Sequence, residues 1–206
     1  CLQRAAGVGV NLLDLEKLAR LKIENAGGAP AFLDYLPDGA KEPFPFALCA
    51  SVNSTIVHGR PHNYSLKSGD LLKLDLGVDW DGGISDAAIT VPIGRISEQD
   101  KKLIRATREA LSAGVSAARP RNTVGDIGYA IQKAAARAGV AIVDGLTGHG
   151  VGTAIHEEPV IYNFGTPGEG AELKPGMVLA IEPMTALGTS KIKHLADDSY
   201  VTLDGS

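Results

Sequence analysis

The chain has 206 residues, 44% of them hydrophobic and 21% charged, which is the composition of a globular protein large enough to bury a sizeable core. Its formal net charge of -4 gives no sign of a surface for nucleic acid or for anionic membranes, either of which would favour a basic patch. No apolar run approaches membrane-spanning length, and no segment has the pattern of a signal peptide. The two cysteines, Cys1 and Cys49, make no disulfide framework, so we expect a reducing cytoplasm.

The first part of the chain predicts a helix, a loop and then strands. Residues 11–26 repeat apolar positions at helical spacing and stop at Gly27-Gly28, a common way for a helix to end. The segment 30–45 is predicted to be a loop because turn-forming residues recur in it, at Pro30, Pro37, Gly39, Pro43 and Pro45. Strand-like runs follow at 46–57, 71–79 and 84–93.

The second part predicts two helices and then further strands. Ser97 with Asp100 and Thr123 with Asp126 both fit the S/T-x-x-D start of a helix. Helical patterns accordingly cover 98–118 and 124–138, and short apolar runs follow at 140–143, 178–183 and 199–203. This order of elements predicts a single α+β domain spanning residues 1–206.

Two aspartates interrupt a predicted hairpin. The stretch LKLDLGVDWDGGISDAA (72–88) reads as a strand, a glycine turn and a returning strand, yet it contains Asp75 and Asp86. Asp is disfavoured in strands and costly to bury without a partner, so these carboxylates are candidates for a functional role. Asp79 and Asp81 are more simply explained as part of the turn.

One segment of the chain echoes another. KSGDLLKLD (67–75) and KPGMVLAIE (174–182) share a Lys, a Gly two positions later, and a carboxylate six positions beyond the Gly. A common turn that leads into a strand would also produce this pattern, but we interpret it as a sign of duplicated halves. The echo predicts that Glu182, like Asp75, has a partner carboxylate a short distance further along the chain.

The remaining candidate ligands are a glutamate and three histidines. Glu182 is a charge inside the apolar run LAIEPM, His149 lies among the glycines of GHGVG, His156 opens HEEP, and His58 is a further candidate. Carboxylates and imidazoles without thiolates suit Mn, Fe, Co or Zn, and two such ions would relieve the repulsion among several carboxylates while activating water for hydrolysis. The two other histidines, His62 and His194, are interpreted as loop and surface residues.

Four motifs together resemble the type I methionine aminopeptidases: SVNSTIVHGRP (51–61), GDLLKLDLGVDWDGGISDAA (69–88), GHGVGTAIHEEP (148–159) and GMVLAIEPM (176–184). The resemblance covers almost the whole chain in the right order. It implies the pita-bread fold, with a pseudo-twofold β-sheet core and helices on its outer face. It also implies a cytoplasmic enzyme that removes the N-terminal methionine from peptides and nascent chains, with the ribosome as a further candidate partner.

The resemblance implies a role for each matching ligand. Asp75 would bind one metal ion through both oxygens, and Asp86 would bridge the two ions. His149 and Glu182 would bind the second ion, and Glu182 would also accept a proton from the attacking water. The ions would be two divalent cations drawn from Co, Mn, Fe and Zn.

The resemblance also implies residues that contact the substrate. His58 would lie near the scissile bond and assist proton transfer, and His156 would donate a hydrogen bond to the carbonyl oxygen in the transition state. Phe44 and Cys49 match positions that line the pocket for the methionine side chain, whose flexible thioether suits a small apolar lining. Cys49 need not then be redox-active.

The chain departs from the family pattern at its ends. It begins with Cys1 rather than Met, and residues 1–6 resemble only the tail of the family's first helix. The family's fifth ligand, a bridging glutamate, would follow a segment like DDSYVTLDGS (197–206), after which the chain stops. Truncation, a natural short form, and substitution by Asp197 or Asp198 are three open explanations, and we expect impaired activity from a chain without this glutamate. A prolidase-like dipeptidase and a non-catalytic polypeptide- or ribosome-binding protein are the alternative functions.

Overall fold

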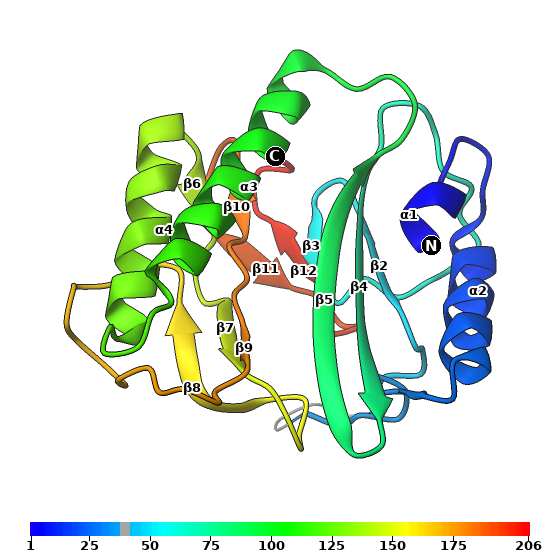
Figure 1. Cartoon of the computed structure of the whole chain (residues 1–206). Coiled ribbons are helices and arrows are strands. Elements are labelled where there is room, and N and C mark those ends of the chain that lie inside the picture. Colours follow the sequence, from blue (N-terminus) through cyan, green and yellow to red (C-terminus); the bar gives the residue numbers. More distant parts are fainter. Residues whose placement is uncertain (38–41) are drawn as a thin grey trace. The chain divides into compact units, whose positions relative to one another are not determined.

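A computed structural model describes residues 1–37 and 42–206, which divide into two compact units (Figure 1). Unit 1 comprises Cys1–Ser97, Lys193–Val201 and Gly205, and unit 2 comprises Glu98–Ile192, Thr202–Asp204 and Ser206. Gly39, one of the residues in the predicted loop, lies outside the described residues. No helix in the described ranges is both long and apolar enough to span a membrane.

Unit 1 is built on a long β-hairpin that is covered by a helix. Its elements are α1 (Leu2–Ala5), α2 (Leu12–Asn25), β1 (Ala29–Pro30), β2 (Cys49–Val52), β3 (Thr55–Val57), β4 (Leu71–Trp80) and β5 (Gly83–Pro92). β4 pairs antiparallel with β5 along its whole length, and with β2 and β1 on its other side. The predicted strand over 46–57 is thus two strands, because a turn at Asn53, which has a φ of 51°, separates them.

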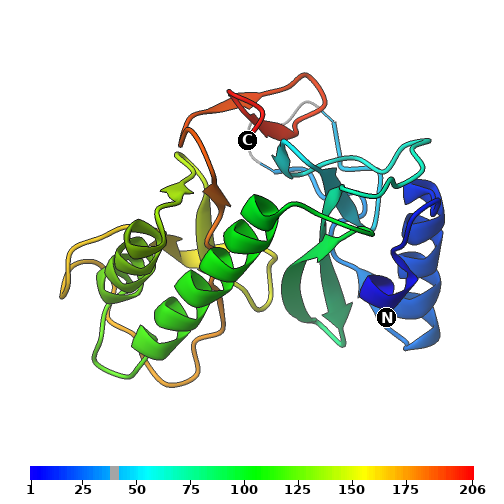
Figure 2. The same cartoon turned by 90° about the horizontal axis from the view of Figure 1, so that it is seen from above.

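The core of unit 1 lies between α2 and one face of this sheet (Figure 2). Leu12, Leu15 and Ala19 of α2 pack with Leu72 and Leu74 of β4. The helix begins where the Asn11 side chain accepts a hydrogen bond from the Leu13 amide. It ends as predicted, because Gly27 adopts a φ of 84° and its N–H donates to the Glu24 carbonyl.

A small sheet near the end of the chain completes unit 1. β11 (Ile192–His194) and β12 (Tyr200–Thr202), most of whose residues belong to this unit, form a sheet with β3 in the order β11-β12-β3. The register sets Tyr200 opposite Val57. Residues far apart in sequence are thereby brought beside the SVNSTIVHGRP motif.

Unit 2 contains a helix pair and a small sheet. Its elements are α3 (Glu98–Ala117), α4 (Val124–Ala138), β6 (Ala141–Ile142), β7 (Thr147–Gly150), β8 (Glu157–Tyr162), β9 (Leu179–Ala180) and β10 (Thr185–Ala186). Both predicted helices are confirmed, and Thr123 and Asp126 form the predicted capping box at the start of α4. The helices pack closely because Gly114 of α3 faces Ile131 of α4, where a Cβ would lie 2.8 Å from a side-chain atom.

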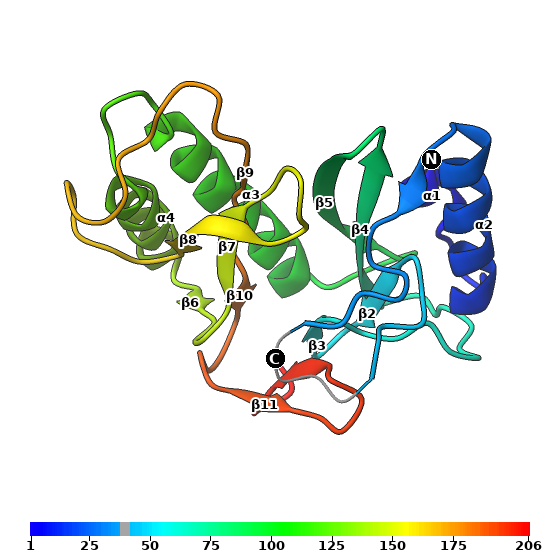
Figure 3. The ribbon, with the colours of Figure 1, turned by 90° about the horizontal axis from the view of Figure 1, so that it is seen from below.

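The sheet of unit 2 has the order β8-β7-β9, and α4 packs on β8 (Figure 3). The strand predicted over 178–183 is wrong in length: only Leu179–Ala180 pairs, with β7, and the chain is irregular from Ile181 to Met184. Glu182 therefore lies just past a strand end, where its side chain is not confined to one face of a ladder.

The echoed segments adopt the same local conformation in their separate units. Gly69 has a φ of 104° and Gly176 a φ of 94°, values that favour glycine. In each turn the amide three residues after the lysine donates to the lysine carbonyl, from Asp70 to Lys67 and from Met177 to Lys174. The echo is therefore structural in the turns: the first turn leads into β4, which contains Asp75, and the second leads toward β9, which ends two residues before Glu182.

Candidate metal centre and active site

The β4–β5 hairpin presents its two aspartates on one face. Asp75 lies opposite Ala88 and Asp86 lies opposite Gly77. Because residues two apart in a strand share a face, Asp75 and Asp86 are diagonal neighbours on the side of the hairpin opposite the Leu72 and Leu74 side chains. The predicted conflict between a buried strand and its charges is resolved, since the leucines face α2 and the carboxylates face away.

Cys49 lies on the same face as these carboxylates. It pairs with Asp75 across β2 and β4, and its thiol is buried. Burial raises the pKa of Cys49 well above its usual value, and the negative charges of Asp75, Asp86 and Glu16 raise it further. The thiol thus stays protonated at neutral pH and behaves as a small apolar group.

Phe44 is partly buried and is held by its backbone. Its N–H donates to the carbonyl of Tyr35 and its carbonyl accepts from the amide of Asp34. Its ring meets that of Phe46 edge to face, with 5.9 Å between the ring centroids. The structure places Phe44 and Cys49 in unit 1, at the two ends of the short segment that leads into β2.

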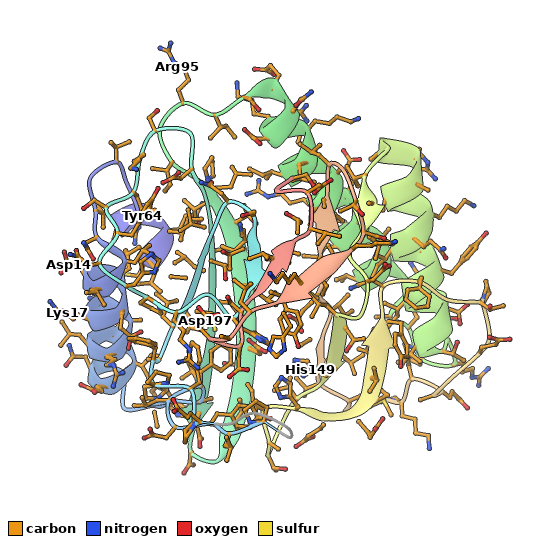
Figure 4. The ribbon with its side chains drawn as sticks, turned by 180° about the vertical axis from the view of Figure 1, so that it is seen from behind. Asp14, Lys17, Tyr64, Arg95, His149 and Asp197 are labelled. Atoms are coloured by element: carbon orange, nitrogen blue, oxygen red, sulfur yellow. The ribbon has the colours of Figure 1, made fainter. Side chains whose placement is uncertain are left out.

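In unit 2, His149 and Glu182 come together. His149, labelled in Figure 4, lies on β7 opposite Ala180 of β9. Ala180 is two residues before Glu182 in the sequence. Its Nε2 is 3.2 Å from Glu182 Oε1. The Asn163 side chain donates to the Glu182 carbonyl at 2.9 Å, which holds the backbone of the glutamate in place.

The glycines beside His149 are required by the neighbouring strands. A Cβ on Gly148 would lie 2.3 Å from the carbonyl oxygen of Ala180, and a Cβ on Gly150 would lie 2.3 Å from that of Glu158. The glycines in GHGVG thus permit a close backbone approach, and the approaching backbone is that of the flanking residues. These contacts hold β7 tightly and so fix where His149 points.

The His149–Glu182 pair fits a divalent metal ion. His149 Nδ1 lies 2.8 Å from the carbonyl oxygen of Gly150, which can only accept, so Nδ1 carries the proton and Nε2 has the lone pair that a metal ion needs. Within the described part of the chain, the buried Glu182 Oε1 accepts no hydrogen bond, although Nε2 is close by. Two atoms that each lie about 2.1 Å from one ion, at about 90–109°, are about 3.0–3.4 Å apart. The observed 3.2 Å falls within that span.

His156 lies next to His149 in unit 2. Their ring centroids are 4.4 Å apart, with the rings edge to face. The loop that carries His156 is closed by Glu157, whose Oε1 accepts from the Thr153 amide, the Thr153 hydroxyl and the Ala154 amide at 2.7–2.8 Å. These hydrogen bonds lower the pKa of Glu157. Glu157 was not among the predicted site residues, although it follows His156 directly in HEEP.

His58 occupies a constrained position at the end of β3 in unit 1. Its backbone has a φ of 58°, which is unusual for a residue other than glycine. The next residue, Gly59, is pressed against β2, where a Cβ would lie 2.7 Å from Ser51 Cα. The His58 ring packs edge to face on Tyr200, with 5.7 Å between centroids.

Asp197 and Asp198 are engaged within unit 1. Asp197 Oδ1 accepts from the amide and the hydroxyl of Ser199, which lowers the pKa of Asp197 although partial burial opposes the shift. Asp198 lies 3.6 Å from Arg60 Nη2 and 3.2 Å from His194 Nε2. These interactions favour a role in the loop over substitution for a further metal ligand.

Comparison with known proteins decides between the candidate families. Residues 2–202 match the model of metallopeptidase family M24. Methionine aminopeptidase 1 of Bacillus subtilis (strain 168) is 40% identical over 198 residues, which cover 96% of this chain and 77% of the relative. The chain belongs to the methionine aminopeptidases of metallopeptidase family M24.

Solved structures agree with this assignment. The crystal structure of the methionine aminopeptidase from Rickettsia prowazekii matches with a TM-score of 0.93 and 32% identity, over 99% of this chain and 81% of that one. The prolidase from Pyrococcus horikoshii matches with a TM-score of 0.71 and 23% identity over 88% of this chain and 48% of that one, so it shares the fold alone. The predicted α+β pita-bread fold is confirmed, and the aminopeptidase function is favoured over the prolidase-like and non-catalytic alternatives.

As a member of this family the chain is a hydrolase and a metalloprotease, and family membership implies a divalent metal. The four predicted ligands divide between the units, with Asp75 and Asp86 in unit 1 and His149 and Glu182 in unit 2.

Proposed function

We propose that the protein removes the N-terminal methionine from peptides and nascent chains, using two divalent metal ions held by Asp75, Asp86, His149 and Glu182. The single observation that carries the metal assignment is the His149–Glu182 contact: Glu182 Oε1 is buried, accepts no hydrogen bond from residues 1–37 or 42–206, and lies 3.2 Å from His149 Nε2. The shared face of Asp75 and Asp86 supports the other half of the ligand set. We further propose that the two units act together as one catalytic domain.

The donor set limits which ions fit. Three carboxylates and one imidazole, without a thiolate, suit Co, Mn, Fe or Zn. When bound, the ions would lower the pKa of a water molecule and polarise the scissile carbonyl group.

The residues around this ligand set would divide the remaining work of peptide hydrolysis. Glu182 would accept the proton that the attacking water loses, a role suited to a carboxylate whose Oε1 is buried and accepts no hydrogen bond within the described ranges. His156 would donate a hydrogen bond to the carbonyl oxygen as negative charge develops on it. His58 would contact the substrate beside the scissile bond and assist transfer of a proton to the departing amine.

Phe44 and Cys49 would line the pocket for the methionine side chain. The protonated, buried thiol and the aromatic ring offer a soft apolar surface, which suits a thioether. Because nascent chains carry N-terminal methionine where they are made, we propose that the protein acts in the cytoplasm, with the ribosome as a candidate partner.

The role of Asp86 can be tested directly. We expect Asp86→Ala to lower kcat/KM for a Met-Ala-Ser peptide by about a hundredfold or more, since a bridging ligand supports both ions. Activity should be measured with added Mn²⁺, and metal affinity by calorimetry. Asp81→Asn at the hairpin turn is the matched control, because Asp81 has a φ of 53°, which asparagine tolerates, and it should retain full activity. Full activity in Asp86→Ala would refute the bridging role.

A further inference from the structure

In unit 1, His58 belongs to a network of side-chain contacts. His58 packs on Tyr200, and Tyr200 stacks on His194, with 4.6 Å between ring centroids and an interplanar angle of 13°. His194 pairs with Asp198 at 3.2 Å, and Asp198 pairs with Arg60 at 3.6 Å. Arg60 is two residues after His58, so the network begins and ends in the same segment of the chain.

Backbone hydrogen bonds fix both segments that contribute to this network, the end of β3 and the turn between β11 and β12. Tyr200 lies opposite Val57, the residue before His58, in the pairing of β12 with β3. At the hairpin tip the Leu195 amide donates to the Ser199 carbonyl and the Asp198 amide donates to the Leu195 carbonyl. The His194, Asp198 and Tyr200 side chains are thereby presented from a well-defined turn to the segment that carries His58.

Packing stability does not account for this arrangement. The side chains of His194 and Asp198 are 52% and 35% exposed, so their ion pair is screened by solvent and contributes little to stability. Their shared effect is geometric, because the stack limits where the Tyr200 ring can lie and the Tyr200 ring limits the rotamers of His58. Interactions of this kind are valuable where a side chain must be held in one orientation.

We propose that His194 and Asp198 are positioning residues for His58, acting through the Tyr200 ring and through Arg60. The proposal rests on the proposed function, in which His58 assists proton transfer. His194 was predicted to be a surface residue and is exposed, yet its ring and its Nε2 are both engaged.

The test combines an activity readout with one that is independent of activity. His194→Ala removes the stack, and Asp198→Gly removes both ion pairs without strain, because Asp198 has a φ of 67° that glycine adopts freely. In the metal-free protein, we expect both variants to move the His58 ring signals in an aromatic ¹H–¹³C NMR spectrum. With Mn²⁺ and a Met-Ala-Ser peptide, we expect kcat to fall about tenfold, with a smaller change in KM and an unchanged melting temperature.

Two further variants sharpen the result. His194→Phe retains a ring that can stack on Tyr200, so it should recover most of the kcat lost in His194→Ala. Asp14→Asn is the matched control, because it removes a carboxylate from an exposed ion pair with Lys17, at 3.5 Å on the outward face of α2, and should change neither readout (Figure 4).

The possible failures are distinguishable. Unmoved His58 signals in both His194→Ala and Asp198→Gly would overturn the positioning proposal. Moved signals with unchanged kcat and KM would overturn its catalytic relevance and would count against the role proposed for His58. His58→Ala separates the two failures: lost activity in this variant would keep the proton-transfer role and reject only the positioning residues, and retained activity would reject the proton-transfer role itself.

Discussion

His149 is oriented in part by a hydrogen bond to its neighbour's backbone. Because Nδ1 is held at the Gly150 carbonyl, the ring presents Nε2 to Glu182. The ring cannot slide along the strand, since Gly148 and Gly150 pack directly on flanking carbonyls. Orientation at this residue is therefore a property of the strand that carries it.

Glu157 holds the loop that carries His156 in place through hydrogen bonds. These hydrogen bonds predict a pH dependence of stability. Hydrogen bonds from the Ala154 amide and from the hydroxyl and amide of Thr153 favour the carboxylate, so the folded pKa of Glu157 is lowered. Its contribution to stability is complete above the unfolded pKa of about 4.3 and is lost as pH falls through the folded pKa.

The variant Glu157→Gln should therefore unfold at a lower temperature than the unsubstituted protein at pH 7, and this difference should shrink below about pH 4.3. Melting temperatures measured from pH 7 to pH 3.5 would test this. Glu169→Gln on an exposed turn of the same unit serves as the control, with no expected difference. A gap that stays constant across the range would show that packing, not charge, is responsible.

At the scale of elements, α2 does more than cover the sheet. Its residue Glu16 is buried, and the carboxylate accepts from the amides of Ala47 and Leu48 at 3.0 and 2.9 Å, and from Arg20. Arg20 also donates to the Pro45 carbonyl. Glu16 and Arg20, one turn apart in α2, thus hold the backbone between Phe44 and Cys49 in place. Phe44 and Cys49 are the two residues proposed to line the methionine pocket.

We expect Glu16→Ala to lower the free energy of unfolding by about 3 kcal/mol, because two buried amides lose their acceptor and Arg20 loses its partner. Urea unfolding monitored by circular dichroism would measure the change. Glu24→Ala, on the exposed side of the same helix, should cost less than about 0.5 kcal/mol. Equal effects of the two substitutions would contradict the role of Glu16 in holding this backbone segment.

Sequence reasoning succeeded where a residue's role is set by its near neighbours. The glycine at the end of α2, the capping box of α4 and the hairpin that carries Asp75 and Asp86 all follow from local pattern. It failed where distant segments decide the role. Glu16 is buried only because the segment at 47–48 returns to α2. β7 was missed because TGHG has little strand propensity and is held by flanking strands.

At the scale of the whole molecule, the proposed ligands are divided equally between two compact units. Each unit has its own hydrophobic core, and each carries two of the proposed ligands. Under the proposed function, a metal ion that binds the native ligand set and not the unfolded chain stabilises both units together.

Added Mn²⁺ should therefore raise the melting temperature, and excess chelator should reverse the rise. At a metal concentration one hundred times Kd the gain is about 2.7 kcal/mol. His149→Ala and Asp86→Ala, which alter one ligand in each unit, should both weaken the response. If only one of them did so, the proposal that ligands of both units serve the same ions would be wrong.

The left-handed backbone at His58 has a consequence for how this chain can change. A histidine at a φ of 58° costs about 1 kcal/mol relative to a residue that accepts this conformation readily, and the hydrogen bonds of Gly59 with Ala50 and Ser51 hold the segment against β2. Selection for stability alone would thus replace His58 with Gly or Asn. Under the role proposed for His58, position 58 would be a site of trade-off between folding and turnover: a library screened for heat resistance would discard the histidine, and a screen for activity would retain it.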